Sequence, residues 1–300
     1  MANEFEVIDI KEENYPLLLK EIPNPPKQIY VRGVIPDLRL PAVAIVGTRK
    51  ATTAGIGIAE EVAADLASRG ITIISGLAMG IDTAAHRGAL GVRGKTVAVL
   101  GNGISEIYPA QNERLAEEIL GTGGAIISEY PPGEPSFKGN FIHRNRIISG
   151  LSVAVVVVEA PLRSGALNTA GFAAEQGRSV FVIPGPVTHP NYVGSHALIR
   201  DGAILATGAA DILEDLGLIG EEAGTRQLAD GIGEISIQPE LSDYESLILE
   251  VIKTAGRPLE VDRIAPLANL EAQAVNQALT GLLLKGLIRE VNGKYEISYR

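Results

Sequence analysis

Basic, amide and small side chains flank a Val-rich segment of the sequence, residues 153–158. These flanking residues are Lys138, Arg144, Asn145, Arg146, Ser164, Gly165, Asn168 and Thr169. Guanidinium, ammonium, amide and backbone N–H groups suit a polyanion, because all of them donate hydrogen bonds and some carry positive charge. The stretch has no nucleophile beside a base. It predicts anion binding, although a core strand with capping Ser and Thr explains the stretch about equally well.

Two other turns carry the residue types of a phosphate site. One apolar run ends in Gly47 and is followed closely by Arg49. Glycine permits close approach and arginine can engage two oxygens, but an isolated turn of this kind is as often a solvated loop. The next run ends in Ser75 and Gly76 at a predicted helix entrance, where exposed backbone N–H groups favour anions.

Metal and cofactor chemistry find little support in the sequence. Asp82 and His86 stand at positions i and i+4, which permits a proton relay but favours a capping carboxylate and a side-chain pair. The four histidines lack metal-ligand spacing, so we expect no metal. The Gly-x-Gly pairs at 55–57 and 101–103 lack the third glycine of a dinucleotide fingerprint. No cofactor is therefore expected.

The elements that must position these residues alternate between strand and helix. Residues 1–40 form a Pro-rich lead-in that packs on the main domain, with a strand at 28–32. Further strands are expected at 42–46, 71–74, 97–100, 125–128, 153–158, 180–183 and 203–205. Helices are expected at 55–69, 81–91, 112–121, 141–150, 166–176, 194–200 and 209–215. This α/β order over 41–216 predicts a doubly wound, mostly parallel sheet, in which ligands bind at the carboxyl ends of the strands.

The last part of the chain differs in kind. Residues 217–240 are acidic and predict a linker, and 241–300 predict a small C-terminal winged-helix domain. Its three helices are expected at 243–254, 260–266 and 271–285, and a hairpin at 288–291 and 294–297 turns through Asn-Gly. The third helix has few basic residues, so a protein-contact or dimer-supporting module is favoured over one that reads DNA.

The amino-acid composition excludes several classes of function. The 300 residues carry a formal net charge of −10, which argues against a generally basic nucleic-acid binder and leaves only a local binding patch. There are no cysteines, so disulfides and Cys-ligated metals are excluded. The N-terminus lacks a signal-peptide pattern and no apolar run reaches membrane-spanning length. We expect a cytoplasmic protein without a membrane partner.

Eight motifs occur in order over about 160 residues of the chain. They are Gly47-Thr48-Arg49, Ser75-Gly76-Leu77-Ala78-x-Gly80-Ile81-Asp82-x-x-Ala85-His86, Tyr108-Pro109-x-x-Asn112, Ser128-Glu129-Tyr130-Pro131, Arg144-Asn145-Arg146-Ile147-Ile148-x-Gly150-Leu151-Ser152, Ser164-Gly165-Ala166-Leu167-x-Thr169-Ala170, Val180-Phe181-x-x-Pro184-Gly185 and Leu198-Ile199-x-x-Gly202-Ala203. Each motif is modestly specific, and together they are very specific. In these motifs the chain resembles the DNA-processing protein A family (DprA/Smf), and the resemblance covers roughly 15–215.

The resemblance implies a Rossmann-like domain that binds single-stranded DNA and is not an enzyme. Family members protect incoming single strands in natural transformation, help load the RecA recombinase and typically act as homodimers. The strand-binding residues carry over to Arg49, Ser75, Gly76, Lys138, Phe141, Arg144, Asn145 and Arg146, with the loop Ser164, Gly165, Asn168 and Thr169 closing the pocket. Phe141 is either a base-stacking side chain or a core residue. Binding would neutralise three or four phosphates per subunit.

The sequence departs from the family pattern in two places. The chain begins about where the N-terminal helical domain of many relatives ends, so the resemblance implies nothing about functions housed in that domain. Ala110-Gln111 replaces a basic residue after Tyr-Pro, so either affinity is weaker or Arg114 supplies the phosphate contact.

Two rival hypotheses are weighed against DNA binding. One is a nucleoside-monophosphate N-glycosidase, but the Pro-Gly-Gly turn of that group is absent and Glu175 follows Thr169 by six residues instead of three. The other is a pure protein-interaction scaffold, which predicts no DNA binding at low salt.

Overall fold

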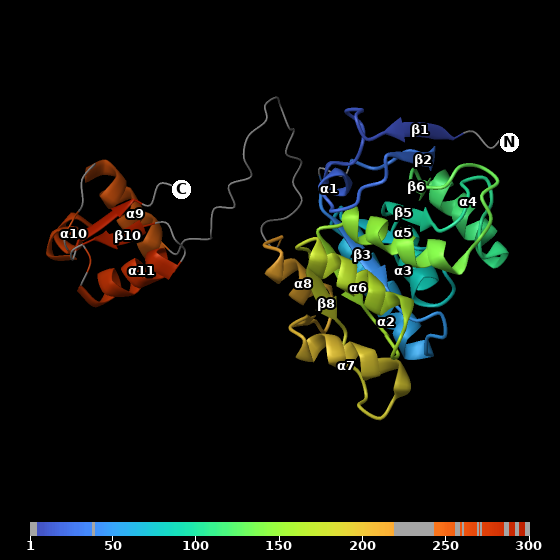
Figure 1. Ribbon diagram of the computed structural model, residues 1–300. Coiled ribbons are helices and arrows are strands. Elements are labelled where there is room, and N and C mark those ends of the chain that lie inside the picture. Colours follow the sequence, from blue (N-terminus) through green and yellow to red (C-terminus); the bar gives the residue numbers. More distant parts are fainter. Residues whose placement is uncertain are drawn as a thin grey trace. The chain divides into compact units, whose positions relative to one another are not determined.

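A nine-stranded sheet forms the centre of the first of two units, residues 1–225, and residues 226–300 form the second (Figure 1). The computed structural model describes residues 5–37, 40–218, 243–255, 259, 261–268, 270, 272–284, 288–291 and 294–297. Most of the predicted linker at 217–240 therefore lies outside the described residues. Each unit is described by itself.

The sheet has the strand order β1-β2-β6-β5-β4-β3-β7-β8-β9. Its strands are β1 (Glu6–Asp9), β2 (Gln28–Gly33), β3 (Ala42–Val46), β4 (Thr72–Ser75), β5 (Thr96–Leu100), β6 (Ala125–Ser128), β7 (Ala154–Val157), β8 (Ser179–Val182) and β9 (Ile204–Leu205). Strands β3 to β9 pair in parallel, whereas β1 and β2 add antiparallel pairs at one edge. The predicted doubly wound, mostly parallel α/β sheet is confirmed.

Helices cover both faces of this sheet. They are α1 (Leu17–Lys20), α2 (Thr53–Ser68), α3 (Ile81–Gly91), α4 (Glu113–Gly121), α5 (Lys138–Gly150), α6 (Gly165–Glu175), α7 (Val193–Arg200) and α8 (Ala209–Asp215), with 3₁₀ turns η1 (Ala110–Asn112) and η2 (Pro190–Tyr192). The lead-in departs from expectation, because β1 and α1 were not predicted. Each has four residues, too few to show a period in the sequence.

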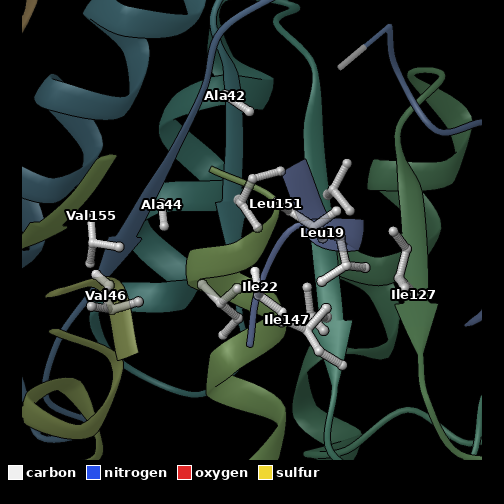
Figure 2. Packing of buried hydrophobic residues seen from close by; sticks show 14 of the residues in the cluster. Leu19, Ile22, Ala42, Ala44, Val46, Ile127, Ile147, Leu151 and Val155 are labelled. Carbon is white, nitrogen blue, oxygen red and sulfur yellow. The ribbon is translucent and has the colours of Figure 1, made fainter. Parts of the chain in front are cut away.

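Continuous apolar runs form the central strands because those strands are buried on both faces. Along β3, Ala44 and Val46 face one core cluster and Val43 and Ile45 face the other. Figure 2 shows the first cluster, where Ile147 from α5 packs with residues of α1 and of the strands. The same alternation runs along β7.

The reversal of strand order places the candidate site. From β3 the chain proceeds outward through β4, β5 and β6, and it returns to pair β7 with the other side of β3. At such a switch point the loops after neighbouring strands separate and leave a crevice at the carboxyl ends. The loops after β3, β4, β5 and β7 therefore lie along one edge of the sheet.

Helix α5 begins three residues earlier than the predicted 141, at Lys138, with Phe137 in extended conformation as the residue before the helix. Polar residues and a glycine open the helix, so its first turn carries no apolar period that would reveal it. Lys138 and Phe141 thus stand on the first turn of the same helix as Arg144.

The second unit contains the elements expected of it. Helices α9 (Asp243–Ala255), α10 (Val261–Ala268) and α11 (Ala272–Leu284) precede the strands β10 (Ile288–Val291) and β11 (Lys294–Ile297), which pair antiparallel. Ile248, Ile264, Leu282 and Ile288 belong to a core of its own. The winged-helix assignment, and what its third helix contacts, stay predictions.

Candidate nucleic-acid interface

A pocket of about 110 Å³ opens at the carboxyl ends of the strands in the first unit. Three loops and helix α5 line it, each following or flanking a different strand. The lining residues are Arg49, Gly76, Ala78, Met79, Tyr108, Pro109, Phe141 and Arg144. Four of them, Arg49, Gly76, Phe141 and Arg144, are among the residues that the sequence pointed to.

Two guanidinium groups converge on one aromatic ring in this pocket. The guanidinium carbon of Arg49 lies 5.7 Å from the centroid of the Phe141 ring, and that of Arg144 lies 5.9 Å from it. Both distances are within the range of a cation–π contact. Tyr108 packs against the same ring, with a centroid separation of 5.4 Å and an interplanar angle of 42°. Phe141 is half-buried, so it is neither a core residue nor a fully exposed one.

Arg49 and Arg144 differ in how they are held. Arg49 is exposed and, within the described part of the chain, forms no hydrogen bond or ion pair through its side chain. Arg144 is 4% exposed, and its Nη1 donates to the carbonyl oxygens of Gly76, at 3.0 Å, and of Val99. Its Nε donates to Asn145 Oδ1 at 3.2 Å. Arg144 is thus a fixed cation at the pocket floor, and Arg49 is a free one at the rim.

Burial lowers the pKa of Arg144 to about 10, with Asp82 acting to raise it and Arg49 to lower it. The guanidinium therefore stays protonated at neutral pH. Burial raises the pKa of Asp82, against the opposing effect of Arg144 and of two backbone N–H groups. With Asp82 ionised, one of the two cations is balanced inside the protein. An anion that enters the pocket would neutralise the charge of the second cation, Arg49.

Gly76 is required by this arrangement. A Cβ at Gly76 would lie 2.7 Å from Asp82 Oδ2 and 2.8 Å from Arg144 Nη2, so no larger residue fits between them without a shift. Asp82 Oδ2 also accepts the backbone N–H groups of Gly76, at 3.2 Å, and of Ala78, at 3.3 Å. The capping role predicted for Asp82 is wrong, because Gly80 is the N-cap residue of α3 and no side chain caps that helix. The Asp82 carboxylate instead bonds two amides of the turn before the helix, which an anion would otherwise use.

The predicted pair between Asp82 and His86 is wrong. His86 is fully buried, and its Nδ1 lies 2.7 Å from Thr96 Oγ1, which donates in turn to the Ile73 carbonyl at 2.8 Å. The hydroxyl proton is committed to Ile73, so Nδ1 carries the proton that bonds Thr96. Burial, followed by the charge of Arg144, lowers the pKa of His86 to about 3. A neutral core imidazole that contacts β5 is no part of a proton relay.

Asn145 ties α5 to the loop after β7. Its Nδ2 donates to the Gly165 carbonyl at 3.1 Å, and the Thr169 hydroxyl donates to that same oxygen at 3.3 Å. Thr169 is buried, Asn168 is exposed, and Ser164 is the N-cap residue of α6. Among these groups Asn168 and the exposed backbone of Gly165 remain accessible. None of the four loop residues lines the pocket itself, so they form its margin.

The structure does not bring Arg146 and Ser75 into this group. Arg146 is 4% exposed, and its Nη2 pairs with Glu129 Oε1 at 2.6 Å while its Nε donates to the Asn24 carbonyl at 3.0 Å. The Ser75 hydroxyl donates to the Ile45 carbonyl at 2.7 Å between adjacent strands. Both side chains serve the fold. The expectation that Arg146 contacts phosphate is therefore dropped, because its guanidinium is already paired and buried.

Three other residues were weighed from the sequence. Lys138 is exposed on the first turn of α5, three residues before Phe141. Arg114 pairs with Glu118 one helical turn along α4, at 3.0 Å. Glu175 is the last residue of α6, about 15 Å along an 11-residue helix from the loop at its start. A carboxylate placed there is far from the position that hydrolysis would require.

Sequence reasoning missed Tyr108, Pro109, Ala78 and Met79 as pocket residues. Tyr108 and Met79 are each 45% exposed. The sequence signal for Tyr108 and Pro109 was their motif Tyr-Pro-x-x-Asn. Met79 occupies the variable position of the motif Ser75-Gly76-Leu77-Ala78-x-Gly80. Asn112 of that motif is buried and donates to the Leu77 carbonyl at 2.8 Å, so the motif also anchors the turn after β4.

The described residues contain no cluster of three or more His, Asp or Glu side chains placed to hold a metal ion. None of the helices among the described residues is long and apolar enough to cross a membrane.

Comparisons with known proteins agree with the motifs. The sequence profile of the family "DNA recombination-mediator protein A" matches residues 6–217. Protein Smf of Escherichia coli is 41% identical over 292 residues, which cover 96% of this chain and 76% of Smf. The structure of DNA processing protein A from Streptococcus pneumoniae superposes with a TM-score of 0.66 at 42% identity, covering 71% of this chain and 74% of the other.

A second solved structure, of DNA processing protein A from Helicobacter pylori, has a TM-score of 0.63 at 30% identity and covers 72% of this chain and 98% of its own. That structure is described for its unique single-stranded DNA binding mode. The profile match spans most of the first unit, and the identities are high over most of the chain. The chain therefore belongs to the DNA recombination-mediator protein A (DprA/Smf) family.

Proposed function

We propose that this chain binds single-stranded DNA at the pocket between the loops after β3, β4 and β5 and the first turns of α5. The observation that carries the proposal is the convergence of Arg49 and Arg144 on the ring of Phe141, beside Tyr108. Cations beside partly exposed aromatic rings suit an unpaired strand, because phosphates can contact the cations and bases can stack on the rings. The single-stranded DNA binding named for the H. pylori relative supports the same ligand.

Binding without turnover is part of the proposal. Arg49 and Lys138 would neutralise phosphates, the buried Arg144 would add positive charge from the pocket floor, and Gly165 N–H and Asn168 at the margin would fix the path of the strand. Such contacts to phosphate and ring faces carry little sequence information. The pocket offers no nucleophile with its base, and Glu175 lies at the remote end of α6.

The finer roles follow from family membership. We propose that the chain protects incoming single strands, helps load the RecA recombinase, acts as a homodimer and works in the cytoplasm. Co-purification with RecA on a single strand and sedimentation of the free protein would test the two protein partners.

A binding titration tests the central proposal. Fluorescently labelled single-stranded and duplex DNA of equal length are titrated with the full chain at two salt concentrations. We expect tighter binding to the single strand, because bases in a duplex are stacked and unavailable to Phe141 and Tyr108. Phe141→Leu should weaken single-strand binding and leave the weak duplex binding unchanged. Equal affinity for both DNAs, or free base released from nucleoside monophosphates, would contradict the proposal.

A further inference from the structure

A fully buried carboxylate stands just beyond β7, and the proposed interface does not use it. Glu159 is 0% exposed and accepts four hydrogen bonds. Two come from Thr52, through its backbone N–H at 3.1 Å and its hydroxyl at 2.5 Å, and the others come from Asn191 Nδ2 at 2.8 Å and the Tyr192 hydroxyl at 3.2 Å. Burial acts to raise the pKa of Glu159, but these bonds outweigh it and lower the pKa below its usual value. Glu159 is therefore an anion saturated with donors.

These bonds enclose the loop that carries Arg49. The Glu159 carbonyl oxygen accepts the backbone N–H of Thr48 at 2.8 Å, immediately before Arg49. The carboxylate holds Thr52, the N-cap residue of α2, three residues after Arg49. One residue thus fixes the chain on both sides of the exposed arginine.

Asn191 supplies a third tie from a distant part of the sequence. It lies in η2, and its side-chain amide has two N–H donors. One meets Glu159 Oε2 at 2.8 Å, and the other meets the carbonyl oxygen of Lys50 at 3.0 Å. Asn191 therefore connects the carboxylate to the middle of the Arg49 loop, although its own side chain does not line the pocket.

We propose that Glu159 and Asn191 are positioning residues that hold the loop 47–52 in the conformation in which Arg49 faces Phe141. The inference rests on the proposed function, since its consequence is affinity for single-stranded DNA. The segment between β3 and α2 has no regular structure of its own. Without the three ties, a loop with an exposed arginine would have to be ordered by the ligand, at an entropic cost to binding.

A double-mutant cycle separates positioning from a general loss of structure. Asn191→Ala removes the bond to Lys50 and one of four bonds to Glu159, and it leaves the other ties in place. We expect single-strand affinity to fall roughly three- to tenfold, a change within the range of one or two hydrogen bonds. In an Arg49→Ala background the same change should have little further effect, because the loop then has no cation to position. Thermal unfolding of each variant monitors folding.

Val187→Ala is the matched control, since Val187 is 82% exposed in the connection that leads into η2. It should leave affinity unchanged. Glu159→Gln is a second probe, because it keeps the shape of the side chain but turns an N–H group toward donors. We expect a larger loss of affinity from this variant.

The outcomes are distinguishable. If Arg49→Ala leaves affinity intact, the proposed interface fails and this inference fails with it. If Arg49→Ala weakens binding but Asn191→Ala does not, or if the two effects add fully, the interface stands and the positioning role is wrong.

Discussion

Arg49→Ala removes the one pocket cation that no carboxylate or carbonyl of the described residues holds. A charge-assisted hydrogen bond contributes about 1.5 to 3 kcal/mol. Because Arg49 is exposed and screened by solvent, we take values at and just below the lower end of that range, about 1 to 2 kcal/mol, or roughly five- to thirtyfold in Kd. Stability should change by less than about 0.5 kcal/mol, as for other surface positions.

The slope of log affinity against log salt gives a second, independent reading. Each phosphate neutralised on a single strand contributes about −0.7 to this slope, so contacts by the exposed Arg49 and Lys138 predict roughly −1.4. Removing Arg49 should reduce the magnitude by about 0.7. Fluorescence anisotropy at four salt concentrations measures both quantities for the parent and the variant.

Arg87→Ala is the matched control for this experiment. Arg87 is an exposed arginine on α3 that does not line the pocket, and its loss changes the net charge equally. It should leave both affinity and slope near the parent values. If Arg49→Ala binds with parental affinity and slope, or if Arg87→Ala weakens binding as much, the pocket is not where phosphates bind.

Three further predictions follow from buried groups. Gly76→Ala should cost about 1 to 3 kcal/mol of stability and weaken DNA binding, because its Cβ would crowd Asp82 and Arg144; thermal unfolding and anisotropy check this. Arg146→Met should cost about 2 to 3 kcal/mol, somewhat less than for a fully buried ion pair because the Glu129 side chain is 21% exposed, while the folded protein keeps parental affinity. His86 has a folded pKa of about 3, below the unfolded value, so the unfolded state binds the proton first. Unfolding free energy should fall by up to about 1.4 kcal/mol per pH unit below pH 6.5, and urea titrations of His86→Asn should show a smaller fall.

The sheet was predictable because its signal is local. Five- and six-residue apolar runs identify strands buried on both faces, and glycine-rich turns separate them from amphipathic helices. The two elements that were missed, β1 and α1, are too short for a period. Their places depend on tertiary pairing, since β1 forms only by pairing with β2 at the edge of the sheet.

The residue types of the site could be predicted from the sequence, but the directions in which their side chains point could not. Arg144 and Arg146 are two positions apart on α5, and residues i and i+2 of a helix do not face the same way. That spacing alone argues that one of them turns from the pocket, but only the fold shows which. Tyr108 comes from an irregular loop, whose direction no period encodes. His86 finds its partner on β5, a contact between elements that the i, i+4 rule cannot anticipate.

A chain with net charge −10 can bind a polyanion if its cations act at short range. At physiological salt, interactions between exposed charges are largely screened beyond about 8 Å, so acidic residues elsewhere oppose binding weakly while contacts in the pocket keep their strength. Stacking of bases on Phe141 and Tyr108 does not depend on net charge, and only unpaired bases can stack there. The partly exposed rings of Phe141 and Tyr108 therefore favour single strands over duplex, and neutralising surface acids far from the pocket should change this preference little.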